Sequence, residues 1–365
     1  MKGRIIGPAG ASAGKARQRG FVLVLVLALL VILSIIATTV ATTTQRLRDE
    51  QLQRQTELAG DLEMASTRAS VMYLLLSQRM TFGGLTVDDR IVLSEDERAG
   101  RRSGDATISY MPVGNEIALD GRIYQGLGST RFALQDDRGR LAVNWMPSDY
   151  LQRYLGVGGP DSLPMATLSN LLRDYQDPDD LYRLNSLERD GYEARGLVPP
   201  TNRTLVTPLE LRRVWGWNDV LPEEDAVLLD TLTTRRSSQL NVNTASARAL
   251  MALPGIDQGL AERVVQARQV QPFLSLASFV QVVGGVPGSE DVLSLYPSDS
   301  GTLKVWSSDG GEVRIVHWTL TPRDDGGRPW REDYEFSLSQ LESDVGVAAR
   351  RPASPVFADA VPASG

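Results

Sequence analysis

Residues 21–41 read FVLVLVLALLVILSIIATTVA and contain no charged side chain. A helix of this length and polarity can cross a bilayer core of about 30 Å. Residues 1–20 carry five positive charges and no acid, and positive charges in front of a membrane span stay in the cytoplasm. We therefore expect a single-pass anchor that leaves everything after residue 41 on the outer side of the membrane.

The apolar run begins abruptly at Gly20-Phe21, and no Ala-x-Ala site follows it. The missing site argues against a secretory signal peptide, while an ordinary signal anchor fits the same hydropathy. The junction Arg19-Gly20-Phe21 resembles the processing site of type IV pilins and of type II secretion pseudopilins. This resemblance implies a prepilin leader, residues 1–20, cut after Gly20 by the prepilin peptidase, and N-methylation of Phe21 in the bacterial inner membrane.

The fifth residue after the junction is Leu25, where most members of these families carry Glu. Leu in this place is typical of one subclass, the K-type minor pseudopilin. The usual Glu is thought to pair with the neighbouring subunit's N-terminal ammonium inside an apolar helix bundle, where an unpaired charge is costly. A subunit at the filament tip has no subunit above it to neutralise, so Leu25 indicates a tip position.

Residues 42–80 contain few helix breakers, and their apolar side chains recur mostly at steps of three, four and six. This pattern predicts an amphipathic helix that continues the anchor. A helix over residues 21–80 would be about 90 Å long. Such a long helix, apolar first and amphipathic later, is the spine of pilin-like proteins.

The rest of the chain predicts an α+β fold, in which the spine helix packs on an antiparallel sheet and a large all-α domain is inserted into the sheet domain. Strand-like runs surround a long region of helical segments divided by Pro and Gly, and Asp136-Asp137-Arg138-Gly139 reads as a hairpin turn. The expected parts are a leader (1–20), a spine helix (21–80, with 21–41 in the membrane), a first sheet segment (81–146), a helical insertion (147–297), a second sheet segment (298–345) and a disordered tail (346–365).

A helix-hairpin-helix is predicted over residues 240–268, where Pro254-Gly255 turns the chain between two short helices. DNA-binding hairpins commonly carry a second Gly where this chain has Asp257. Removal of the leader's five positive charges changes the formal net charge from −7 to −12. A carboxylate at the phosphate site of so acidic a body argues against DNA binding, and we expect no nucleic acid partner.

The order of motifs also resembles the K-type family. Asn-Val-Asn-Thr-Ala before the Leu-Pro-Gly hairpin resembles the helical domain of K-type pseudopilins, as do the acidic stretch near residue 180 and ALQDDRGRLAVNW at residues 133–145. Together with Gly20-Phe21 and Leu25, the likeness covers most of residues 17–283. No single motif decides the family, but their order along the chain is specific.

A cluster of acids predicts a possible Ca²⁺ site. Carboxylate oxygens on a loop suit a hard cation that accepts six to eight oxygens, although the spacing does not fit an EF-hand, and a solvated acidic loop with helix caps explains the same residues. The resemblance to Ca²⁺-binding family members favours the metal. The candidate ligands are Asp174, Asp177, Asp179, Asp180 and Glu188.

Signals for catalysis are poor. The chain has no Cys, and its one histidine, His317, lies in a strand pattern, where a packed or surface role is expected. We therefore predict that the protein is not an enzyme.

The function predicted from these patterns is that of a K-type minor pseudopilin, which initiates and caps the tip of the periplasmic pseudopilus for protein export across the outer membrane. The resemblance implies other minor pseudopilins, the prepilin peptidase, and secreted substrates or the outer-membrane secretin as partners. Two alternatives fit some of the same features: a membrane-anchored DNA-uptake receptor that uses the helix-hairpin-helix, and a minor pilin of a type IV pilus.

Overall fold

The computed structural model describes residues 19–88, 110–157, 163–308, 310–322, 327–340 and 346–357. The chain divides into two compact units, Met1–Ala59 and Gly60–Gly365. Helix α1 (Arg19–Ser77) begins in the first unit and ends in the second. Arg19, Gly20 and Phe21 lie in the first turn of this helix, and residues 1–18 of the predicted leader lie outside the described residues.

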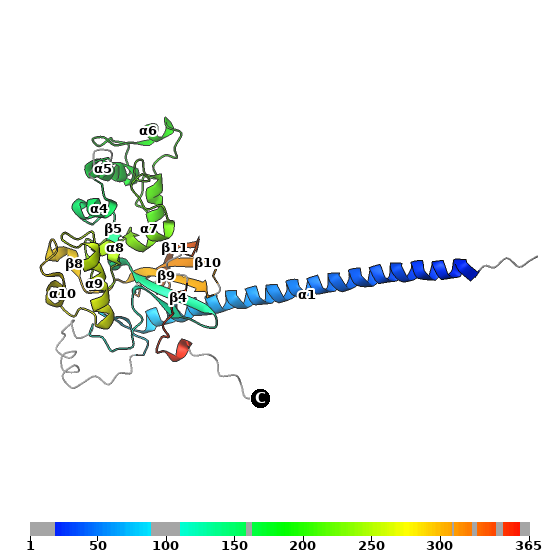
Figure 1. The fold of residues 1–365 in the computed structure, drawn as a ribbon. Coiled ribbons are helices and arrows are strands. Elements are labelled where there is room, and N and C mark those ends of the chain that lie inside the picture. Colours follow the sequence, from blue (N-terminus) through cyan, green and yellow to red (C-terminus); the bar gives the residue numbers. More distant parts are fainter. Residues whose placement is uncertain are drawn as a thin grey trace, which may run out of the picture. The chain divides into compact units, whose positions relative to one another are not determined.

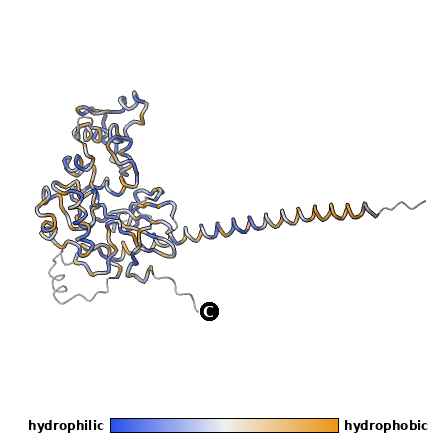
Figure 2. The backbone as a smooth tube through the Cα atoms, viewed as in Figure 1, coloured by the Kyte–Doolittle hydropathy of each residue, from blue (hydrophilic) through white to orange (hydrophobic). Residues whose placement is uncertain are grey.

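The first part of α1 is apolar and exposed on all sides. Its Val, Leu and Ile side chains from Val22 to Val40 are 45–64% exposed, and Figure 2 shows this part in the hydrophobic colour. Among the described helices, α1 is the one long and apolar enough to cross a membrane. Since exposed apolar surface of this extent is unfavourable in water, the helix fits a single-pass membrane anchor.

The threonines at the end of the apolar part satisfy their own hydroxyl groups. Thr38 Oγ1 donates to the Ser34 carbonyl, Thr39 Oγ1 to that of Ile35, and Thr43 Oγ1 to that of Thr39, each over 2.8 Å. A hydroxyl bonded back to the preceding turn needs no partner from outside the helix. These residues are therefore compatible with a lipid environment.

The second unit contains a five-stranded antiparallel sheet with the order β11-β10-β9-β4-β3 (Figure 1). The strands β3 and β4 come before the helical insertion, and β9, β10 and β11 come after it, so that β4 pairs with β9 across the insertion. The split-sheet α+β fold predicted from the sequence is confirmed. The strands are β3 (Asp120–Gln125), β4 (Thr130–Asp136), β9 (Ser300–Ser307), β10 (Glu312–Leu320) and β11 (Trp330–Ser339).

The last turns of α1 pack on this sheet. Val71, Leu74 and Leu75 are at most 3% exposed and share a core cluster with Phe132 and Trp318 of the sheet. Burial of each such side chain contributes about 1.5–3 kcal/mol. Polar contacts also hold α1 in position beside the sheet. Glu63 accepts hydrogen bonds from the backbone N–H and the hydroxyl of Ser129, and Thr67 accepts one from the Leu127 N–H.

A small hairpin follows α1 and is formed by β1 (Met80–Thr81) and β2 (Gly84–Leu85). Gly84 has a φ of +134°, and a Cβ there would lie 2.2 Å from the Ile117 carbonyl oxygen. Only glycine therefore fits this position. The close approach lets Leu85 exchange backbone hydrogen bonds with Ile117, which brings the chain back toward β3.

The helical insertion has its own core, which contains Tyr175, Tyr192, Trp217 and Phe279, each at most 1% exposed. Two short parallel pairs, β5 with β6 and β7 with β8, close it near the sheet. The elements are β5 (Leu141–Ala142), α4 (Ser148–Leu155), α5 (Met165–Gln176), α6 (Arg189–Glu193), η2 (Pro208–Arg213), α7 (Asp225–Thr231), β6 (Leu232–Thr233), β7 (Leu240–Asn241), α8 (Ala247–Leu250), α9 (Gln258–Val270), α10 (Leu276–Val283), η3 (Glu290–Val292) and β8 (Leu293–Ser294).

The predicted hairpin turn at residues 136–139 is wrong. Asp136 and Asp137 are 1% exposed, and the chain passes through the short helix η1 (Asp137–Gly139) into β5, which pairs with β6 instead of returning beside β4. Burial raises the pKa of Asp136, and hydrogen bonds from Asn241, Thr244 and the Ser298 N–H oppose that rise. The acids are inside because residues far along the chain supply donors to them.

The tail also differs from the prediction of disorder after residue 345. The Arg350 N–H donates to the Ile123 carbonyl, and the Gln125 N–H donates to the Arg350 carbonyl. A final turn, η5 (Pro355–Phe357), places the Phe357 ring on Phe132 with centroids 5.2 Å apart. Residues 346–357 thus extend the core, and residues 358–365 lie outside the described part of the chain.

Candidate functional site

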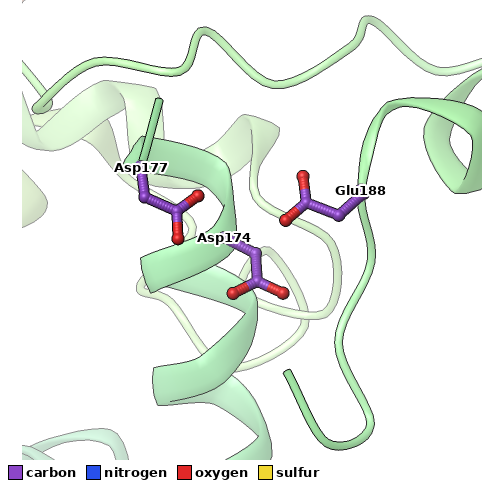
Figure 3. A group of neighbouring side chains, drawn as sticks. All are labelled: Asp174, Asp177 and Glu188. Atoms are coloured by element: carbon purple, nitrogen blue, oxygen red, sulfur yellow. The ribbon is translucent and has the colours of Figure 1, made fainter. Parts of the chain in front are cut away.

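Three predicted ligands meet at the end of helix α5. Asp174 lies in its last turn, Asp177 is its C-cap residue, and Glu188 precedes α6. One carboxylate oxygen from each lies within 4.8 Å of the other two (Figure 3). Acids are unfavourable at a helix C-terminus, where the macrodipole is negative. The α5 terminus is thus not arranged for helix stability, and a nearby cation would relieve the repulsion.

Arg183 supplies the one positive side chain that contacts this cluster among the described residues. Its Nη1 atom donates to Asp174 Oδ1 and to Asp177 Oδ2, and its backbone N–H donates to Asp174 Oδ2 over 2.8 Å. The three carboxylates carry three negative charges against one guanidinium. If all are ionised, two negative charges remain without a partner.

Glu188 is the carboxylate of this cluster that Arg183 does not contact. The residue is 0% exposed, and neither carboxylate oxygen has a hydrogen-bond partner in the described part of the chain. Burial, followed by the charges of Asp174, Asp177 and two further acids, raises the pKa of Glu188 to about 7. An ionised carboxylate without a partner is expensive in the interior. Protonation of Glu188 or a nearby cation would relieve this cost.

The other two predicted ligands lie apart from the cluster. Asp179 Oδ1 accepts a hydrogen bond from the Leu181 N–H over 2.9 Å in an exposed turn after Pro178, and Asp180 is exposed. Their charges act on Glu188 only from a distance. The sequence reasoning missed Arg183, because the density of acids does not tell which of them a neighbouring arginine contacts.

The donor set fits a hard cation. The cluster offers carboxylate oxygens alone, and three of them have no partner: both oxygens of Glu188 and Oδ1 of Asp177. Such oxygens match the ligand preference of Ca²⁺. Ca²⁺ would bring two positive charges to this cluster and give the buried carboxylate of Glu188 a partner.

The predicted helix-hairpin-helix places a capped turn between two short helices. Gly255 has a φ of +81° in the turn between α8 and α9, and Asp257 caps α9 by accepting a hydrogen bond from the Leu260 N–H over 2.8 Å. The buried Arg268 donates to the carbonyls of Val242 and Ala245. Asp257 thus occupies the Leu260 amide and places a carboxylate at the start of α9, where a phosphate would otherwise be held, which argues against nucleic-acid binding.

The Asn-Val-Asn-Thr motif joins the hairpin to the rest of the insertion and to the sheet. Asn241 and Thr244 donate to Asp136 at the end of β4. Asn243 donates to the Phe273 carbonyl and accepts from the Phe273 N–H. These amides act as structural cross-links, which explains why a polar motif lies in the core.

His317 is packed and ion-paired. Its Nε2 lies 2.9 Å from Asp137 Oδ2, and its Nδ1 lies 2.8 Å from Asp333 Oδ2. Burial alone would lower the pKa of His317, but the two carboxylates, Asp137 above all, raise it to about 9. Both ring nitrogens are therefore engaged, and the imidazole serves as a charged cross-link.

The fold and these contacts define a class of protein: a pilin-like α+β protein whose apolar helix ends on an antiparallel sheet that carries a helical insertion. Residues 240–294 match the family model described as type II secretion system (T2SS), protein K. The match confirms for this segment the resemblance to K-type proteins predicted from the sequence. It also supports the prediction of a structural secretion component that is not an enzyme.

Among the solved structures that match the chain is one chain of the crystal structure of the GspK-GspI-GspJ complex from the enterotoxigenic Escherichia coli type 2 secretion system, with 13% identity and a TM-score of 0.43. The similarity covers 81% of the present chain and 100% of that chain. No curated protein matches the sequence.

Proposed function

We propose that this protein is a minor pseudopilin of a type II secretion system that initiates and caps the tip of the periplasmic pseudopilus during protein export. The observation that carries the proposal is the family match over residues 240–294, which include the hairpin and the Asn-Val-Asn-Thr motif. The apolar start of α1 and the Gly20-Phe21 junction support it, because a leader cut there leaves an anchored helix with Phe21 at its N-terminus.

The surface of α1 supports assembly with other spine helices. Leu47, Leu58 and Leu62 are 57–60% exposed and fall on one side of a helix with 3.6 residues per turn. Exposed leucines in this arrangement favour a helical partner with knobs-into-holes packing. We infer that the partners are other minor pseudopilins, which would bury this stripe.

A groove between α1 and the sheet lies in the second unit. It has a volume of about 540 Å³ and is lined by Ala65, Ala69, Met72 and Leu76 of α1 together with Val316 and Trp330 of the sheet. Small residues at its base let another backbone approach closely. Charged side chains, Arg68, Arg314 and Glu332, also line the groove, which offers a partner helix a second surface for packing.

The tip position rests on Leu25 and on the helical insertion. Leu25 cannot neutralise the N-terminal ammonium of a subunit above it, which a buried position in the filament would require. An insertion of the size of residues 147–297 would also obstruct a subunit stacked above it. Both features favour a subunit with nothing above it.

We also propose that Asp174, Asp177 and Glu188 bind Ca²⁺ and thereby stabilise the insertion. The support is the geometry of the cluster and the three carboxylate oxygens that have no partner among the described residues. The ion would join the end of α5 to the start of α6, across a loop that has little secondary structure.

The test of the filament proposal is reconstitution of the full-length protein in detergent with the other minor pseudopilins of the same bacterium, together with a secretion assay of the deletion strain. We expect a stable hetero-complex and a block of protein export that the wild-type gene restores. Export that continues unchanged in the deletion strain, with loss of twitching or adhesion instead, would indicate a type IV pilus and overturn the proposal.

A further inference from the structure

Arg183 occupies the position at which a cation would be held. Its Nη1 atom contacts both Asp174 Oδ1 and Asp177 Oδ2. Ca²⁺ binds carboxylate oxygens at about 2.3–2.6 Å, so an ion shared by these two oxygens would overlap the guanidinium nitrogen. The ion and the arginine side chain therefore exclude each other.

Glu188 shows that the guanidinium does not complete the site. Its side chain faces the two aspartates (Figure 3), is fully buried, and has two oxygens without a partner among the described residues. Arg183 reaches only the other two acids. A divalent cation could contact all three carboxylates and carries twice the charge of the guanidinium.

The Arg183 side chain can leave without unfolding the loop that carries it. It is 39% exposed, and its neighbours Leu181 and Leu184 are 74% and 78% exposed, so solvent lies close to the guanidinium. The backbone N–H of Arg183 donates separately to Asp174 Oδ2. This bond can hold the loop in place while the side chain swings outward.

We propose that Arg183 is an internal competitor of the cation: its guanidinium closes the acidic cluster in the ion-free protein, and Ca²⁺ displaces it to join Glu188 with Asp174 and Asp177. The inference rests on the proposed cation site and adds its regulation. Competition lowers the apparent affinity by the free energy that the arginine contacts contribute. Hydrogen bonds between charged groups of this kind correspond to a change of about tenfold in affinity.

The first experiment is calorimetric titration of the full-length protein in detergent with CaCl₂. Arg183→Gln should bind Ca²⁺ about tenfold more tightly than the wild type, and Arg183→Lys, which keeps the charge but cannot bridge two carboxylates in the same way, should lie between them. Arg173→Gln is the matched control. It removes the same charge next to Asp174, from an exposed side chain that has no ion pair in the described part of the chain, and should change the affinity less than about threefold.

The second experiment needs no variant. An arginine-selective reagent such as phenylglyoxal is applied to the wild-type protein, and modification is read by peptide mass spectrometry. Ca²⁺ should increase the modification rate of Arg183 several-fold and leave that of Arg173 unchanged. This measurement keeps the proposal testable if the Arg183 variants do not fold.

The possible results distinguish competition by Arg183 from the existence of the cation site. Equal Ca²⁺ affinity of the wild type and Arg183→Gln, or protection of Arg183 by Ca²⁺ in the labelling experiment, overturns the competition and leaves the cation site standing. No binding by any of the proteins, Arg183→Gln included, overturns the cation site and the inference together.

Discussion

The side-chain amide of Asn241 in β7 donates to Asp136 at the end of β4 over 3.0 Å, and both residues are buried. The two residues are 105 positions apart in the sequence. Asp136 accepts further bonds from Thr244 and from the Ser298 N–H, so the carboxylate connects the end of β4 with the residues just before the predicted hairpin and with the end of the insertion. The contact is the clearest structural link between the sheet and the insertion.

Loss of this link should destabilise the protein. Asn241→Ala leaves a buried carboxylate with fewer donors and should lower the free energy of unfolding by about 2 kcal/mol, because an unsatisfied buried group costs about 1–3 kcal/mol. Urea unfolding in detergent, followed by circular dichroism, measures the change. Asn144→Ala is the control, since Asn144 is exposed and its side chain pairs with Gln176 alone among the described residues, and it should cost less than about 0.5 kcal/mol. Equal effects of the two variants would show that the Asp136 link does not stabilise the fold.

The charged His317 predicts a pH dependence of stability. A histidine whose pKa rises from about 6.5 in the unfolded chain to about 9 in the folded protein stabilises the fold fully below pH 6.5, and this contribution is lost between pH 6.5 and pH 9. The contribution is about 3 kcal/mol at its maximum. The wild type should therefore lose more stability than His317→Gln between pH 6.5 and pH 9.

The comparison is made by urea unfolding of both proteins at several pH values in the same chelating buffer, so that other titrating groups such as Glu188 contribute equally. Parallel stability curves for the wild type and His317→Gln would contradict the charged cross-link. Below pH 4 a separate loss is expected in the wild type, because the pKa of Asp333 is lowered to about 2, against the effect of burial, by hydrogen bonds from His317, Thr319 and Arg331.

The cation site predicts different roles for two neighbouring acids. Glu188→Gln removes a ligand that Figure 3 shows beside Asp174 and Asp177, and it should weaken Ca²⁺ binding about tenfold or more. Asp180→Asn removes an exposed charge outside the cluster and should change the affinity less than about threefold. Titration calorimetry measures both. A larger effect of Asp180→Asn than of Glu188→Gln would show that the cation does not bind at the cluster of Asp174, Asp177 and Glu188.

The exposed side of α1 predicts where partners bind. Leu58→Glu places a charge in the proposed helix–helix contact and should abolish co-purification with the other minor pseudopilins, while the fold stays intact by circular dichroism. Thr56→Glu adds the same charge on the opposite side of the helix and should leave the complex in place. If both variants co-purify as the wild type does, the leucine stripe is not the interface.

Much of the fold could be predicted from local sequence patterns. The apolar run 21–41 and the spacing of apolar residues over 42–80 predict the long helix from composition and period alone. Turn residues and Pro separate the strands from the helical insertion in the same way. These features depend on neighbours in the sequence, which is why they are visible without a structure.

The sequence-based predictions were wrong at positions where residues distant in the sequence determine the local structure. Asp136 and Asp137 read as an exposed turn, but Asn241, Ser298 and His317 supply the donors that draw them inside. Phe357 read as part of a disordered tail, yet a ring on β4 holds it. At the candidate site the sequence located the acids but not the role of Arg183, since no spacing rule tells which of five carboxylates will be buried without a partner.

The most direct test of the account is the intact mass of the protein purified from membranes of its own bacterium, with tandem mass spectrometry of the N-terminal peptide. The proposal predicts a chain that lacks residues 1–20 and begins with N-methylated Phe21. An intact leader, or cleavage at any other position, would contradict the assignment to the pseudopilins.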